Sequence, residues 1–284
     1  MNFAIQVVDM AKYQYQQVDV FSAQPLRGNP LAVTIAADSL TDDQMLAFAN
    51  WTNLSETTFL LKPTNPKADY RVRIFTPERE LPFAGHPTLG SCHVWLNSGG
   101  KPRGAEIIQE CGIGLVRIAR ESERLAFVAP SLRRSGEVNA DTLDKIARSL
   151  RIPRTSITAS NWVDNGPGWV AVMLATRDEV LALKPDYAAM DGLDIGVVAP
   201  WRNGDAQFEV RAFMPSVGAE DPVTGSFNAG LAQWLIAAKL APTKYVASQG
   251  TVLGRVGRVH VNKIGGEVWV GGHVVTCIEG ILKL

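Results

Sequence analysis

The stretch VRIFTP at residues 72–77 decides the fold, because it returns as VRAFMP at residues 210–215. The copies share V-R-x-F-x-P and lie 138 positions apart (210 − 72). A second shared pattern, E-x-P-x-x-G, follows each copy as ELPFAG at residues 80–85 and EDPVTG at residues 220–225. This spacing is 140 (220 − 80), and a two-residue loop insertion explains the change. A repeat this long lies outside the usual solenoid periods of roughly 20–50 residues, so it predicts two similar halves.

A fainter match extends the repeat upstream, where GNPLAV at residues 28–33 has a partner in GPGWVA at residues 166–171. Three matches in one order with nearly constant spacing predict two halves related by a pseudo-two-fold axis. Residues 70–75 and 208–213 alternate in polarity and read as strands that lead into turns with proline and glycine.

Each of these turns leads into a helix, expected at residues 87–96 and 227–239, that is apolar nearly all round. Such helices are surrounded by protein. The sequence thus predicts an α+β fold whose halves each wrap a curved mixed sheet around a central helix.

Two helices with amphipathic patterns are expected on the outside. Residues 41–50 open with a capping box formed by Thr41 and Gln44, and residues 141–150 carry apolar side chains at helical spacing. Residues 129–140 read as the linker between an N-terminal half, 1–130, and a C-terminal half, 131–284. A return of the last strand to the N-terminal half is also anticipated. Further strands are expected at 15–21, 31–35, 57–61, 168–174, 256–262 and 267–274.

Composition excludes several classes of protein. Apolar residues make up 46% and charged residues 20%, which disfavours disorder. Lysine and arginine (28) balance aspartate and glutamate (28), so no basic field favours nucleic acid or anionic lipid. No apolar run spans a bilayer, and the first residues lack a signal peptide pattern. We expect a soluble cytoplasmic protein whose first dozen or so residues, through about Tyr13, are an extension of unknown role.

The cysteines and histidines do not predict a metal site. The cysteines are odd in number with no CxxC pair, which disfavours a disulfide framework and a zinc knuckle. The histidines show no HExxH or HxH spacing. These residues are Cys92, Cys111, Cys277, His86, His93, His260 and His273.

Two helix starts are candidates for binding an anion. A helix that begins after a glycine turn offers unpaired backbone N–H groups and a positive dipole end. Pseudo-symmetry would bring Gly85 and His86 close to Gly225 and Ser226 across a cleft. The alternative is that the glycines only form tight turns and that Ser226 is an ordinary N-cap.

Two acidic residues are further candidates. Asp221 precedes Pro222 where the first half has Leu81, and the halves should diverge where a function has been built. Aspartate before proline is also a common turn starter. Glu56 lies between an expected helix and strand, where the alternative is a solvated acid.

The chain is similar to the PhzF-like phenazine-biosynthesis isomerase family over nearly its whole length from about Tyr15. Several blocks in the right order carry this resemblance. They are VDVF at 18–21, GNPLAV at 28–33, NLSET at 53–57, FTP at 75–77, FAGHPT at 83–88, EDPVTGS at 220–226, QG at 249–250 and GR at 254–255.

The resemblance implies the fold of diaminopimelate epimerase, with an active site between two similar halves. In those epimerases each half supplies a catalytic cysteine just before the glycine at the helix start. Ala84 and Thr224 stand at these positions. Because neither is a thiol, the resemblance implies that the two-cysteine racemase mechanism does not operate here unless one of the three cysteines reaches the cleft by another route.

The resemblance implies instead a cofactor-independent isomerase of the trans-2,3-dihydro-3-hydroxyanthranilate type. Glu56 would move a proton between two carbons, helped by burial that raises its pKa. His86, Asp221 and Ser226 would orient the substrate, and the amides near Gly85 and Gly225 would hold its carboxylate. Family members are often dimeric, so a homodimer is expected.

Two other functions remain open from the sequence. One is an isomerase or epimerase that acts on a different small amino or hydroxy acid through the same Glu56. The other is a protein that binds a metabolite or a partner in the same cleft without turnover.

Overall fold

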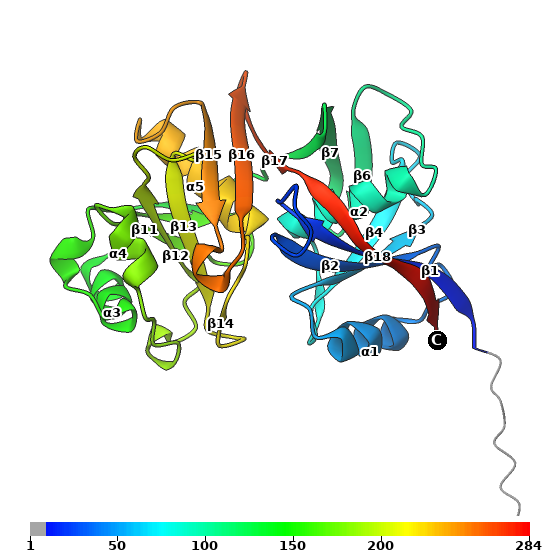
Figure 1. Ribbon diagram of the computed structural model, residues 1–284, viewed down its shortest axis with the longest axis horizontal. Helices are drawn as coiled ribbons and strands as arrows, with labels where there is room; N and C mark the ends of the chain where they lie inside the picture. The colour runs from blue at the N-terminus through cyan, green and yellow to red at the C-terminus, as the bar shows by residue number, and fades with distance from the viewer. Residues whose placement is uncertain (1–9) are drawn as a thin grey trace, which may run out of the picture.

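The computed structural model describes residues 10–284, so the first nine residues of the expected N-terminal extension lie outside the described part. Two α+β halves lie side by side (Figure 1). The first half contains β1 Lys12–Val20, β2 Asn29–Ile35, α1 Asp42–Thr52, β3 Thr57–Leu61, β4 Tyr70–Phe75, β5 Glu80–Leu81, α2 Gly85–Asn97, β6 Ile107–Cys111, β7 Gly114–Glu121 and β8 Arg124–Val128.

The second half repeats this order after one additional strand and helix. It contains β9 Arg134–Gly136, α3 Ala140–Leu150, β10 Ala159–Asp164, β11 Val170–Met173, α4 Arg177–Ala182, β12 Ile195–Pro200, β13 Phe208–Met214, β14 Ala219–Glu220, α5 Gly225–Ala237, β15 Lys244–Gln249, β16 Gly257–Ile264, β17 Glu267–Gly272 and β18 Val274–Lys283. Single-turn 3-10 helices lie at Arg154–Ser156, Ala188–Met190 and Thr251–Leu253.

Strand pairing in the two halves follows one scheme. The β2–β3 and β4–β6 pairs are parallel, and so are their counterparts β11–β12 and β13–β15. The β3–β4 and β12–β13 pairs are antiparallel, and Thr57 lies opposite Phe75 just as Ile195 lies opposite Phe213. The repeat in the sequence is therefore a repeat in the structure.

Each half completes its sheet with a strand that follows the other half in the chain. β9 directly follows β8 of the first half in the chain and pairs with β10, while β18, the last strand of the chain, pairs with β1 of the first half. Figure 1 shows β18, in red, running from the junction into the first half. The antiparallel β8–β17 pair joins the halves into one sheet.

The central helices are buried as their apolar sequences predict. Leu89, Cys92 and Val94 of α2 and Leu231 and Leu235 of α5 belong to one hydrophobic cluster that spans both halves. Burial of this apolar area supplies most of the driving force for folding. Smaller clusters pack beneath α3 and beneath α1.

The expected elements are present, with shifted ends and additions. Both central helices begin two residues earlier than expected, at Gly85 and Gly225, and the capping box of Thr41 and Gln44 is formed. The expected linker at 129–140 contains β9, whose three residues are exposed and show no alternation of polarity. The expected strand at 267–274 ends at Gly272, and β18 follows His273. Within residues 10–284, no helix is long and apolar enough to cross a membrane.

Candidate active site

The two central helices meet at their N-terminal ends. A Cβ atom built on Gly85 would lie 2.8 Å from the Cα of Gly225, and one built on Gly225 would lie 2.9 Å from the Cα of Gly85. Only glycine permits so close an approach of two backbones. The predicted meeting of the two helix starts is thus observed, and two positive helix ends face the same place.

Neither helix start is capped by a side chain. The N-cap positions belong to Ala84 and Thr224, and neither forms a side-chain capping hydrogen bond. The alternative that Ser226 is an N-cap is wrong, because α5 already begins at Gly225. First-turn N–H groups of two helices can therefore bind an anion, for which a carboxylate is suited.

Glu56 and His86 face each other beside these helix ends. Glu56 precedes β3, whereas His86 is the second residue of α2. Glu56 Oε2 lies 3.5 Å from His86 Nε2, and the side chains are 15% and 4% exposed. Both atoms are buried without a hydrogen-bond partner in the described structure. Buried polar atoms without partners are rare in folded proteins, and a missing ligand is one explanation.

Burial sets the protonation of this pair. Loss of solvent, together with the negative charge of Asp221, raises the pKa of Glu56 to about 8. Burial lowers the pKa of His86 to about 3. Near pH 7 the carboxyl group is therefore mostly protonated and the imidazole is neutral.

Asp221 is held beside this pair by residues from both halves. Asn29 Nδ2 donates to Asp221 Oδ1 (2.9 Å) and to the Val223 carbonyl oxygen (2.9 Å), and it lies 3.4 Å from His86 Nδ1. Asn29 Oδ1 is buried and has no partner in the described structure. Asn29 therefore ties the two halves together and leaves an acceptor free.

A second set of hydrogen bonds orients Asp221 from within its own half. Gln249 Nε2 donates to Thr224 Oγ1 (2.9 Å), so the Thr224 hydroxyl donates its own proton to Asp221 Oδ2 (2.6 Å). Gln249 Oε1 also accepts from the Thr224 backbone N–H (3.0 Å) and from Asn228 Nδ2 (2.8 Å). Burial raises the pKa of Asp221, while the bonds from Thr224 and Asn29 oppose this shift.

Ser226 is anchored differently. Its Oγ accepts from Trp169 Nε1 (3.2 Å), and its carbonyl oxygen accepts from Asn165 Nδ2 (2.8 Å). Ser226 as a whole residue is 9% exposed. Its hydroxyl group can still donate its proton to another acceptor.

The structure thus brings together Glu56, His86, Gly85, Gly225 and Asp221, with Ser226 adjoining Gly225. Sequence reasoning missed the supporting residues Asn29, Thr224 and Gln249 as parts of the site. Asn29 and Gln249 lie in the GNPLAV and QG blocks of the family resemblance. However, no periodicity or spacing in the sequence indicates which residues they form hydrogen bonds with. Within residues 10–284, no group of three or more His, Cys, Asp or Glu side chains could hold a metal ion.

Comparisons with known proteins agree with this architecture. The sequence pattern of the family described as phenazine biosynthesis-like protein matches residues 18–280. Among curated relatives, "Antisense-enhancing sequence 1" of Schizosaccharomyces pombe is 37% identical, covering 95% of this chain and 99% of its own. Trans-2,3-dihydro-3-hydroxyanthranilate isomerase of Pseudomonas aeruginosa is 32% identical, covering 94% of this chain and 98% of its own.

Solved structures agree on the fold. A PhzF family protein of Enterococcus faecalis superposes with a TM-score of 0.79 at 27% identity, covering 96% of this chain and all of its own. A hydroxyproline epimerase of Agrobacterium vitis, at 13% identity and a TM-score of 0.57, covers 96% of this chain and 93% of its own and shares the fold alone. The epimerase-like α+β fold predicted from the sequence is confirmed. The chain belongs to the PhzC-PhzF family of phenazine biosynthesis-like proteins and is an isomerase.

Proposed function

We propose that this isomerase moves a proton between two carbons of a small cyclic amino acid, of the trans-2,3-dihydro-3-hydroxyanthranilate type, with Glu56 as the general acid and base. One observation carries the proposal: the buried Glu56 carboxyl faces His86 at 3.5 Å without a hydrogen bond, beside two uncapped helix ends. A relative that is 32% identical over 94% of this chain bears the name of that isomerase.

The helix ends at Gly85 and Gly225 would bind the substrate carboxylate through first-turn N–H groups. Glu56 as carboxylate would take a proton from one ring carbon, and the released electron pair would shift the adjacent double bonds. Glu56 as carboxylic acid would then deliver this proton, or one acquired by exchange with solvent, to a second carbon of the conjugated system. Substrate and product have the same atoms, and the enzyme returns to its starting state.

A raised pKa suits this double role. A general acid and base works best when its pKa lies near the working pH, and that of Glu56 is raised to about 8. About one molecule in ten then carries the ionised form at pH 7. An ammonium group on the substrate, facing Asp221, would favour ionisation of Glu56 in the complex.

The test compares wild type with Glu56→Gln on trans-2,3-dihydro-3-hydroxyanthranilate in D2O, followed by ultraviolet absorbance and by deuterium incorporation. General acid and base catalysis contributes roughly 10²–10⁴-fold, so the variant should lose at least ~10² in turnover. Glu78→Gln is the matched control, because Glu78 is an exposed acid of the same half. It should keep full activity.

The possible outcomes test the role of Glu56 and the identity of the substrate separately. Wild-type turnover that Glu56→Gln retains would remove Glu56 from the mechanism. Wild type without turnover would reject this substrate, and thermal-shift screening of small carboxylates would then separate an isomerase of another amino or hydroxy acid from a protein that only binds one.

A further inference from the structure

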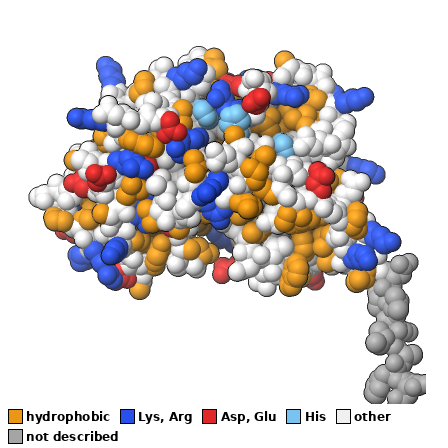
Figure 2. All heavy atoms as spheres, viewed as in Figure 1, with side chains coloured by type: hydrophobic (Ala, Val, Ile, Leu, Met, Phe, Trp, Pro, Cys, Tyr) orange, Lys and Arg blue, Asp and Glu red, His pale blue; other side chains and the backbone are white. Residues whose placement is uncertain are grey.

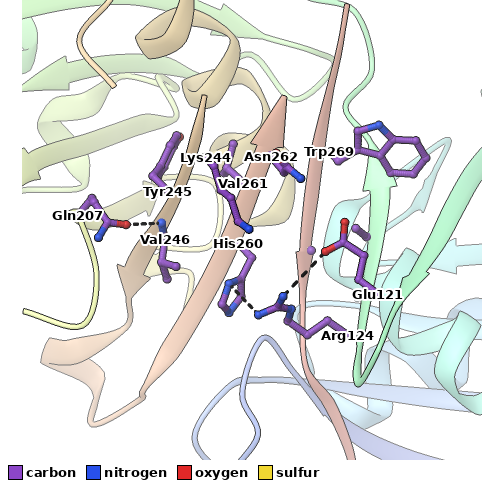
Figure 3. Close-up of a pocket in the computed structure, with 12 residues that line it drawn as sticks. Glu121, Arg124, Gln207, Lys244, Tyr245, Val246, His260, Val261, Asn262 and Trp269 are labelled. Atoms are coloured by element: carbon purple, nitrogen blue, oxygen red, sulfur yellow. Dashed lines mark hydrogen bonds and ion pairs between the residues drawn. The ribbon is translucent and has the colours of Figure 1, made fainter. Parts of the chain in front are cut away.

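A pocket opens on the outer face of the sheet where the two halves join. It has a volume of about 200 Å³ and shares no residue with the site of Glu56 and His86. Figure 3 shows Arg124 and Glu121 approaching it from one side and His260 and Lys244 from the other. The wall residues are Glu121, Arg124, Ala126, Gln207, Lys244, Tyr245, Val246, His260, Val261, Asn262, Trp269 and Gly271.

The bottom of the pocket is unfilled because β8 and β17 carry the small residues Ala126 and Gly271 at this place. Gly271 of β17 lies opposite Ala126 of β8 and opposite His260 of β16. A Cβ atom on Gly271 would lie 2.4 Å from the Leu125 carbonyl oxygen, so a side chain is excluded. The longer side chains of Arg124 and His260 therefore line the sides of the pocket.

Arg124 reaches the pocket with unused donors. Its Nε is buried and has no partner in the described structure. One terminal nitrogen lies 3.3 Å from His260 Nδ1, and the other lies 4.0 Å from a Glu121 carboxylate oxygen. That last distance is too long for a hydrogen bond. A buried guanidinium donor without an acceptor is costly and points to a missing anion.

His260 and Lys244 add donors from the second half. Because a guanidinium cannot accept, His260 Nδ1 accepts from Arg124, and the imidazole proton is on Nε2. Burial and the positive charge of Arg124 lower the pKa of His260 to about 4, with His273, Arg258 and Lys244 acting in the same direction. Lys244 is exposed at the rim and forms no ion pair with any residue that the structure describes.

The charges leave the pocket positive. Two cations, Arg124 and Lys244, face the single carboxylate of Glu121, and His260 is a neutral donor. Figure 2 shows histidine atoms at the surface of this face with lysine and arginine side chains around them. A guanidinium fork with an ammonium group is a frequent arrangement for binding phosphate oxygens.

We propose that this junction pocket binds a small phosphate-bearing metabolite, with its phosphate held by Arg124, His260 and Lys244. The remaining volume, beside Asn262 and Trp269, receives the organic part of the ligand. The phosphate would bridge the two halves, because Arg124 belongs to β8 and the other two residues to β15 and β16.

The pocket also lies behind the candidate active site. Side chains alternate along a strand, so Ala126 faces the pocket while Phe127 faces the helices. The Phe127 ring lies 3.0 Å from a Cβ position built on Gly85 at the start of α2. A ligand bound over β8 would therefore lie on the opposite face of the strand that contacts the start of α2.

The test uses inorganic phosphate as the probe and does not depend on isomerase activity. We expect a saturable shift of the His260 imidazole signals in NMR spectra and a raised Tm, both at constant ionic strength maintained with chloride. Arg124→Gln should weaken phosphate binding about tenfold or more. Lys244→Gln, at the exposed rim, should weaken it about threefold.

Lys263→Gln is the matched control, because Lys263 is an exposed lysine of β16 outside the pocket. It should bind phosphate like wild type. Binding that survives in both Arg124→Gln and Lys244→Gln, or that acetate reproduces at equal concentration, would overturn the proposal. Absence of a saturable response in wild type would overturn it as well. If Arg124→Gln does not fold, the comparison of Lys244→Gln with Lys263→Gln decides.

Discussion

Glu56 and Asp194 occupy the same place in the two halves, yet their surroundings differ. Each directly precedes the strand that lies antiparallel to the VRxFxP strand, and they are 138 positions apart (194 − 56). Glu56 faces a neutral imidazole, and burial raises its pKa to about 8. Burial raises the pKa of Asp194 to about 6, and the positive charge of Arg79 opposes this shift.

The starts of the two central helices also carry different side chains in the two halves. The first half has Leu81, Ala84 and His86 where the second has Asp221, Thr224 and Ser226. The two halves have equivalent backbones that meet at Gly85 and Gly225, and different side chains occupy the equivalent positions. The chemistry that we propose depends on this asymmetry, because the Glu56 carboxyl group faces the His86 imidazole while the pKa of Asp194 is held lower by the positive charge of Arg79.

The contact between the two halves should be the most sensitive feature. Gly225→Ala would place a methyl group 2.9 Å from the Gly85 Cα, and overpacking of this kind costs about 3 kcal/mol of unfolding free energy. Urea denaturation measures the loss. Gly104→Ala is the control, because the nearest atom to its added Cβ is 3.9 Å away. Equal stability of both variants would contradict the close approach.

The raised pKa of Glu56 should appear in the pH dependence of stability. A carboxyl whose pKa rises from 4.5 to about 8 on folding favours the protonated native state. Its contribution is complete below the unfolded value and is lost as pH rises through the folded one. Glu56→Gln should therefore be more stable than wild type by about 2 kcal/mol near pH 6, by more at higher pH, and nearly equal near pH 4. Parallel pH profiles in urea denaturation would contradict this.

Thr224→Val tests the hydrogen bonds that only the second half possesses. The change keeps the shape of the side chain but removes the donor to Asp221 and the acceptor for Gln249. We expect a loss of about 1.5 kcal/mol of stability. The pKa of Asp221 should rise, which NMR titration of its carboxyl carbon would detect. Ser22→Ala, which removes a short-range bond to the Gln24 carbonyl oxygen, should leave that titration unchanged.

The smallest effect is expected at the counterpart of the proposed acid and base. Asp194→Asn should lower turnover less than about tenfold, since the positive charge of Arg79 opposes the rise in the pKa of Asp194 and favours its ionised form. The comparison with Glu56→Gln uses one substrate and one assay. A loss as large as that of Glu56→Gln would show that both halves move protons.

The internal repeat predicted much of this architecture. The patterns at residues 72–77 and 210–215 located the paired strands, and the glycines after them located the two helix starts. The return of the last strand to the first half was anticipated, and β18 pairs with β1. The pairing of β9 was not predictable, because β9 is short and exposed and carries no alternation. Its position depends on pairing with β10 rather than on local preference.

The sequence by itself determined the two halves, their buried central helices and the glycines between them, because periodicity and backbone freedom are local properties. Only the resemblance selected Glu56, which no local pattern separates from a solvated acid. The tertiary structure decided that Glu56 faces His86, that Asn29 reaches Asp221, and that Arg124 meets His260. The physical reason is that burial, pKa and hydrogen-bond partners depend on contacts between segments far apart in the chain.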